Sequence, residues 1–201
     1  MNYNTNRIFV EKKEGFRVEA LSLQSELNEN LGLSIKALRL LNVYDLGGFS
    51  ADLLEKCRYT VFGEIVTDTV VDSFPLEGRK YLAVEYIPGQ FDQRASSAVD
   101  CVHLIEPEAD VQIRSSRLLV FDDDMSEADL KAVKHYYINA VESREKDLSK
   151  LNETYLTPNL YYFFFAKCLL RIIIFAVRLL LRVRYPLAGI PVRDTGSWPL
   201  E

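Results

Sequence analysis

Apolar positions in residues 1–77 recur with two periods, one typical of strands and one typical of helices. Between Phe16 and Leu31 the apolar side chains lie three or four residues apart, which predicts an amphipathic helix. Gly32 follows as the expected left-handed residue at its C-terminal end, and Ser50 can cap a second, shorter helix. The expected elements of this half are strands at 7–11, 36–46 and 59–71 and helices at 16–31 and about 51–57.

The same alternation begins again after Pro75 and Gly78. A strand-like run ends at Pro88-Gly89, a pair of residues typical of turns, and an amphipathic helix follows. Asp92 falls in the first turn of that helix, where a carboxylate complements the helix dipole. The expected elements of this half are strands at 81–87 and 111–121 and helices at 91–105 and 126–151.

Strand–helix–strand–helix therefore occurs twice, and the two occurrences divide near residue 77. The repeat is architectural, because the residues themselves do not repeat. The pattern predicts an α+β fold in which residues 1–77 and 78–154 form two ferredoxin-like halves, packed together as a pseudo-dimer. A divergent tail, residues 155–201, follows them.

Three segments resemble one enzyme family. They are YIPGQFDQRASSAVDC at 86–101, RIFVEKKEGF at 7–16 and KHYYINAVESREKDL at 134–148. Their order and spacing are similar to those of the N-terminal domain of the large, single-chain phosphoribosylformylglycinamidine synthase. The resemblance covers residues 7–154, and it implies a domain similar to two joined copies of the small S subunit of the multi-subunit enzyme. Ala140 stands where the family pattern favours Pro, so a kink at that point is not implied.

The resemblance also implies a function. Enzymes of this family are ligases of purine biosynthesis that convert formylglycinamide ribonucleotide, glutamine and ATP to the amidine. Their ATP- and Mg-binding synthetase domain and their glutaminase domain lie beyond the matched residues. The resemblance therefore implies a cytoplasmic docking and coupling domain whose partners are those two domains. On this interpretation the chain has no cofactor and no ligase activity of its own.

Two of the resembling segments contain the residues that we expect at an interface with these partner domains. The candidate interface residues are Pro88, Gly89, Gln90, Asp92, Gln93, Arg94, Glu142 and Arg144. The competing interpretation is that they are solvated helix ends with weak local ion pairs.

No residue pattern indicates a catalytic, cofactor-binding or metal site. The sequence has no phosphate-binding glycine loop and no nucleophile motif, and His103 and His135 lack metal-ligand spacing. The aspartates at 122–124 are typical of a solvated turn before a helix rather than of a cation site. Cys57, Cys101 and Cys168 are read as reduced thiols of a cytosolic protein, and the N-terminus lacks the apolar region of a signal peptide.

Charge is unevenly distributed along the chain. The net charge is −5, but residues 159–201 contain six basic and two acidic groups, so the preceding residues are strongly acidic. An acidic domain argues against nucleic acid as a partner, because phosphate contacts need clustered Lys and Arg.

The tail has two interpretations. Apolar residues predict a helix at about 160–184, yet Lys167, Arg171 and Arg178 interrupt it, and each would be costly in the middle of a bilayer. We favour an out-of-frame or fragment continuation, because the resemblance and the composition change together near residue 157. The alternative is a stand-alone ferredoxin-like binding module whose basic, apolar tail lies on a membrane surface.

Overall fold

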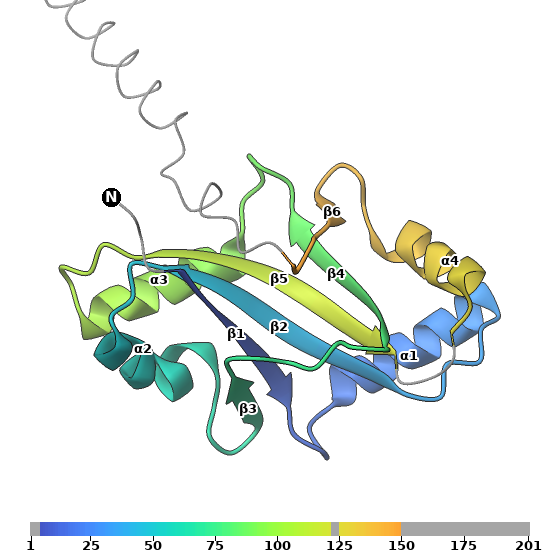
Figure 1. Ribbon diagram of the computed structural model, residues 1–201, viewed down its shortest axis with the longest axis horizontal. Helices are drawn as coiled ribbons and strands as arrows, with labels where there is room; N and C mark the ends of the chain where they lie inside the picture. The colour runs from blue at the N-terminus through green and yellow to red at the C-terminus, as the bar shows by residue number, and fades with distance from the viewer. Residues whose placement is uncertain (1–4, 122–124, 150–201) are drawn as a thin grey trace, which may run out of the picture. The chain divides into compact units, whose positions relative to one another are not determined.

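The computed structural model describes residues 5–121 and 125–149, which contain four α-helices and six strands (Figure 1). The first half contains β1 (Thr5–Lys12), α1 (Val18–Leu31), β2 (Leu38–Gly47), α2 (Ala51–Cys57), a π-helical turn η1 (Arg58–Phe62) and β3 (Asp68–Val71). The second half contains β4 (Lys80–Tyr86), α3 (Gln93–Ile105), β5 (Gln112–Phe121), α4 (Glu127–Tyr137) and β6 (Ser143–Glu145). The predicted α+β class is confirmed.

All six strands belong to one antiparallel sheet with the order β3-β1-β2-β5-β4-β6. The halves meet at its centre, where β2 pairs with β5 from Leu38 opposite Phe121 to Gly47 opposite Gln112. Each half contributes its strands in the same order from the edge inward: third, first, second.

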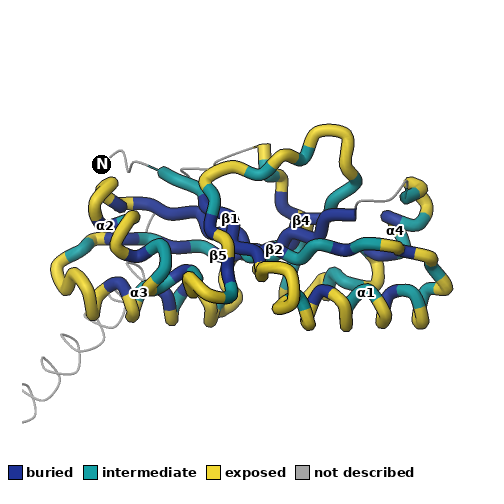
Figure 2. The backbone as a smooth tube through the Cα atoms, turned by 90° about the horizontal axis from the view of Figure 1, so that it is seen from below, coloured by how far each residue is buried: buried dark blue, intermediate teal, exposed yellow. Residues whose placement is uncertain are grey.

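Side chains alternate between the two faces of the sheet. On β1, Ile8 and Val10 point to the face that the helices cover, whereas Phe9 points to the opposite face. That opposite face is covered by Phe74 and Leu148 from irregular segments. Figure 2 shows α1 and α3 on the same side of the sheet.

The two longest described helices contact both halves, although α3 packs chiefly on β5 and α1 chiefly on β2, each within its own half. Helix α3 belongs to the second half but packs with α2 and with Ile8 and Val70 of the first half. Helix α1 belongs to the first half but packs with α4 and with Leu82 and Leu119 of the second half. Two separate hydrophobic clusters therefore lie side by side on the helix-covered face (Figure 1).

Several predicted helix ends are confirmed. Gly32 follows α1 with a φ of 64°, and the Ser50 hydroxyl accepts a hydrogen bond from the Leu53 N–H at the start of α2. Asp92 is the N-cap of α3 rather than a residue of its first turn.

The predicted strand at 59–71 is wrong over its first part. Residues 58–62 continue from α2 as the turn η1, in which the Thr60 hydroxyl donates to the Lys56 carbonyl oxygen at 2.6 Å. This path places the Phe62 ring against Tyr44, 5.0 Å between ring centroids, so tertiary packing overrides the strand propensity. Only Asp68–Val71 forms a strand.

The predicted final helix is wrong after Tyr137. The Asn139 carbonyl oxygen accepts hydrogen bonds from Glu142 N–H and Ser143 N–H, and the chain reverses into β6. Leu148 lies within the helix expected at 126–151 but instead packs on the opposite face of the sheet. Ala140 lies in this turn, so the reversal forms without a proline.

None of the described helices is long and apolar enough to cross a membrane. The predicted tail helix, Cys168 and the three aspartates at 122–124 lie outside the described residues.

Candidate functional site

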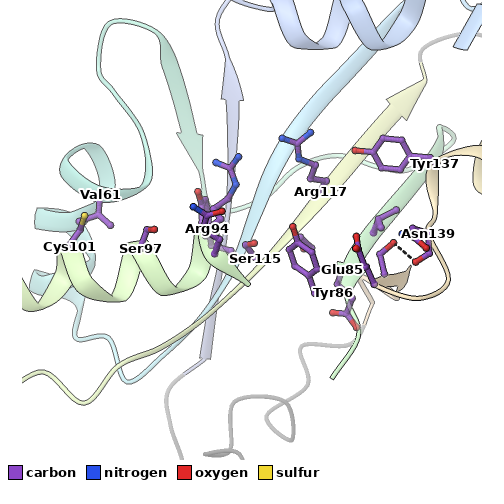
Figure 3. Close-up of a pocket in the computed structure, with 17 residues that line it drawn as sticks. Val61, Glu85, Tyr86, Arg94, Ser97, Cys101, Ser115, Arg117, Tyr137 and Asn139 are labelled. Atoms are coloured by element: carbon purple, nitrogen blue, oxygen red, sulfur yellow. Dashed lines mark hydrogen bonds between the residues drawn. The ribbon is translucent and has the colours of Figure 1, made fainter. Parts of the chain in front are cut away.

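A groove of about 710 Å³ separates the two hydrophobic clusters on the helix-covered face (Figure 3). Strands β2, β4 and β5 form its floor, helix α3 forms one side, and the segment after α4 forms the other. The principal lining residues are Tyr44, Val84, Arg94, Ser97, Cys101, Ser115, Arg117, Tyr137 and Asn139.

The two predicted interface segments meet beside this groove. The Ile87 N–H donates to the Glu142 carbonyl oxygen at 3.0 Å, and the Gln90 side-chain amide donates to the Val141 carbonyl oxygen at 3.2 Å. Gly89 has a φ of 100°, a left-handed conformation that suits glycine and closes the turn. The fold thus joins residues that are some fifty positions apart.

Exposed apolar side chains surround the junction. Phe91 is 72% exposed, Val141 is 71% exposed and Tyr86 is 43% exposed. Pro88, Gly89, Gln90 and Glu142 lie among them and are exposed as well. We call this surface, residues 86–91 and 141–142, the docking edge.

Asp92 serves the fold rather than the surface. One carboxylate oxygen accepts from the Ala95 N–H at 2.9 Å and from the Ser115 hydroxyl at 2.8 Å. The other accepts from the Ser115 N–H at 2.8 Å. Asp92 therefore caps α3 and fixes it to β5, which positions the two following residues, Gln93 and Arg94, on the wall of the groove.

Arg144 belongs to a different environment, the opposite face of the sheet. Its guanidinium donates to Glu85 at 2.8 and 2.7 Å. Nearby, the Lys146 ammonium is 2.6 Å from the Asp45 carboxylate and 3.6 Å from Glu85. We call these side chains, together with Arg7 and Ser116, the ionic cluster.

The ionic cluster alters the titration of Asp45. Burial acts to raise the pKa of this carboxyl, but the hydrogen bond from Arg7 and the charge of Lys146 outweigh burial and lower the pKa below its ordinary value. Asp45 is therefore an ionised, structural carboxylate rather than an acid–base group poised near neutral pH.

Arg117 and Tyr137 were not identified from the sequence as site residues. Arg117 Nη1 lies 2.6 Å from the Glu19 carboxylate. Burial acts to lower the pKa of its guanidinium, but the interactions with Tyr137 and Glu19 outweigh burial and raise it. Arg117 directly precedes the apolar run Leu118–Phe121, and the sequence did not reveal what its side chain faces.

The remaining candidate groups do not converge. His103 contacts the Ala109 carbonyl oxygen at 3.1 Å, and His135 is exposed on α4. Cys57 is buried, and this burial raises the pKa of its thiol, whereas Cys101 is exposed on the groove wall. Within 5–121 and 125–149, no group of three or more His, Cys, Asp or Glu residues fits a metal ion.

Comparison with models of known protein families, with curated proteins and with solved structures finds no match to this chain.

Proposed function

We propose that this chain is an S-subunit-like docking and coupling domain of phosphoribosylformylglycinamidine synthase. On this proposal it acts in the cytoplasm and binds the synthetase and glutaminase domains of that enzyme. ATP and magnesium belong to the synthetase domain, so this chain alone forms no amidine.

One observation carries the proposal: the three segments that resemble the family contact one another in the fold. Segment 86–101 joins segment 134–148 through Ile87 and Glu142. Segment 7–16 joins segment 134–148 through the Arg7 guanidinium, which donates to the Leu148 carbonyl oxygen. The three segments, each of which resembles the family on its own, thus form one connected region of the fold. This is expected when they share a role.

The pseudo-dimer is part of the proposal. Its support is the strand order, which is the same from either edge of the sheet, and the reciprocal packing of α3 with the first half and of α1 with the second. Two copies of a small subunit joined in one chain would produce both features.

The docking edge is the surface that we assign to the partner domains. It combines large exposed apolar side chains with a polar rim, which is the composition of protein interfaces. The ionic cluster lies on the other face, where Arg144 is held by Glu85, so we exclude Arg144 from the contact surface.

The test is reconstitution. A large-type synthase lacking its N-terminal domain is mixed with the 201-residue chain, and complex formation and glutamine-dependent amidine formation are measured. We expect binding and a gain of activity, both lost in a Phe91→Ser, Val141→Ser double variant. The matched control is Leu104→Ser, which alters a side chain 86% exposed on α3 outside the docking edge. Absence of a complex, equal loss in the control, or amidine formation by the chain alone would contradict the proposal.

A further inference from the structure

The groove is lined by charged and hydroxyl-bearing side chains that docking at the neighbouring edge does not require. Arg94, on the wall formed by α3, is exposed and has no hydrogen bond or ion pair among the described residues. Ser97 lies one turn further along α3 and adds a hydroxyl group to the same wall.

A second guanidinium approaches from the floor. Arg117 comes from β5, and its contacts with Glu19 and Tyr137 orient the guanidinium while leaving part of its five-donor fork available. Figure 3 shows Arg94 and Arg117 at the same groove. Two arginines supply the bidentate donors that suit carboxylate or phosphate oxygens.

The carboxylates near the groove have partners of their own. Both oxygens of Asp92 are occupied by Ala95 and Ser115. Glu85, which also lines the groove, is held by Arg144, and Glu19 pairs with Arg117. Glu142, at the rim, is exposed.

Tyr44 provides the observation that points into the groove. Its side chain is buried, with the residue only 4% exposed, yet its hydroxyl has no hydrogen-bond partner among the described residues. No fully buried side-chain oxygen or nitrogen of those residues lacks a partner. The Tyr44 hydroxyl therefore reaches the open volume of the groove, which Tyr44 lines. A buried tyrosine usually finds a partner for this group, so a ligand atom is the natural one.

We propose that the groove binds a small organic oxyanion, a carboxylate or phosphate group on a compact organic body. Arg94 and Arg117 bind the charged group, and the Tyr44 hydroxyl donates to it or to a neighbouring oxygen. The exposed ring of Tyr86, which also lines the groove, packs against the organic part. A volume of about 710 Å³ lies within the ~300–1,000 Å³ of small-molecule sites. This proposal is independent of the docking function.

The test is titration of the ¹⁵N-labelled 201-residue chain with phenyl phosphate, benzoate and inorganic phosphate at constant ionic strength, followed by amide NMR shifts. We expect at least one probe to shift groove residues Ser97, Ser115 and Arg117 and to saturate. Saturation by phenyl phosphate or inorganic phosphate assigns a phosphate group, and saturation by benzoate alone assigns a carboxylate.

Two variants test the named donors. Tyr44→Phe removes the hydroxyl while keeping the ring, and Arg94→Gln removes an exposed charge. Each is expected to weaken binding roughly tenfold, the effect of one hydrogen bond to a charged group. Neither should lower the thermal midpoint, because neither group has a hydrogen-bond partner within residues 5–121 and 125–149. The control is Lys131→Gln, a cation exposed on α4 away from the groove.

Several outcomes would overturn the proposal. These are no saturable shift with any probe, equal weakening in the Lys131 control, or unchanged binding in both groove variants. Binding of hexaglutamate without binding of the small probes would also overturn it, since the groove would then be a protein-docking site.

Discussion

Replacing Lys146 by methionine removes one charge from the centre of the ionic cluster while keeping a side chain of similar length. The Lys146 side chain is only 6% exposed, and its ammonium lies 2.6 Å from Asp45, 3.1 Å from the Ser116 hydroxyl and 3.6 Å from Glu85. After the change, the Asp45 and Glu85 carboxylates, which have little solvent access, have one neighbouring positive charge fewer.

The size of the expected loss in unfolding free energy depends on the cations that still contact these two carboxylates. Removing one partner of a buried ion pair costs about 3–5 kcal/mol when the other charge is left uncompensated. Here Arg7 still binds Asp45, at 2.5 and 3.2 Å, and Arg144 still binds Glu85. Because each carboxylate keeps one cation, we expect a smaller loss of unfolding free energy, about 2 kcal/mol.

Urea unfolding at neutral pH, followed by far-ultraviolet circular dichroism, measures this loss as a change in midpoint at constant slope. Lys131→Met is the matched control, since Lys131 is exposed on α4 and its change is expected to fall within about 0.5 kcal/mol.

The pH dependence provides a second measurement. The pKa of folded Asp45 lies below its ordinary value, so its contribution to stability is present above about pH 4 and is lost as the pH falls through the folded pKa. Without Lys146 that pKa rises, so the Lys146→Met protein should unfold in acid at a higher pH than the original chain. A loss no larger than that of the Lys131 control, together with an unshifted acid midpoint, would refute the role assigned to the ionic cluster.

Three further changes test the fold around the site, each by the same urea titration. Asp92→Ala removes the α3 cap and its bonds to β5 and should cost about 1–3 kcal/mol, whereas Asp100→Ala on the exposed side of α3 should be near neutral. Leu27→Ala in the α1–α4 cluster should cost about 2–5 kcal/mol, compared with little for Leu21→Ala, which is 62% exposed. Gly63→Ala should cost about 1–3 kcal/mol, because its new Cβ would lie 2.8 Å from a side chain of β3.

Local signals in the sequence correctly predicted most of the elements. Gly32 and Ser50 mark helix ends through their own backbone and side-chain chemistry, so no distant residue is needed to interpret them. The two errors occurred where a distant partner decides the outcome. Residues 58–62 follow the packing of Phe62 on Tyr44, and residues 143–145 pair with the edge of β4.

The candidate site was predictable only in part, for the same reason. The two segments of the docking edge are each distinctive in the sequence, but their contact through Ile87 and Glu142 depends on the turn that ends α4 early. Asp92 was assigned to the surface, and its hydrogen bonds with Ser115 of β5 became visible only in the structure. Nothing near Arg117 in the sequence indicates the groove, because its contacts with Glu19 and Tyr137 come from distant elements.

The packing of the helices against both halves links these features physically. Helix α3 provides one wall of the groove. Its buried face packs on β5 and also shares a cluster with Ile8 and Val70, so the position of Arg94 depends in part on the first half of the chain. The opposite side of the groove follows α4, whose buried face packs on α1 from that same first half. The groove and the docking edge share Tyr86 and Glu142. A partner that moves the segment after α4 must therefore also change the groove, whereas a ligand held by Arg94 and Tyr44 would favour one position of that segment. If the partner and the ligand each prefer one arrangement of these shared residues, binding at one site changes the affinity of the other.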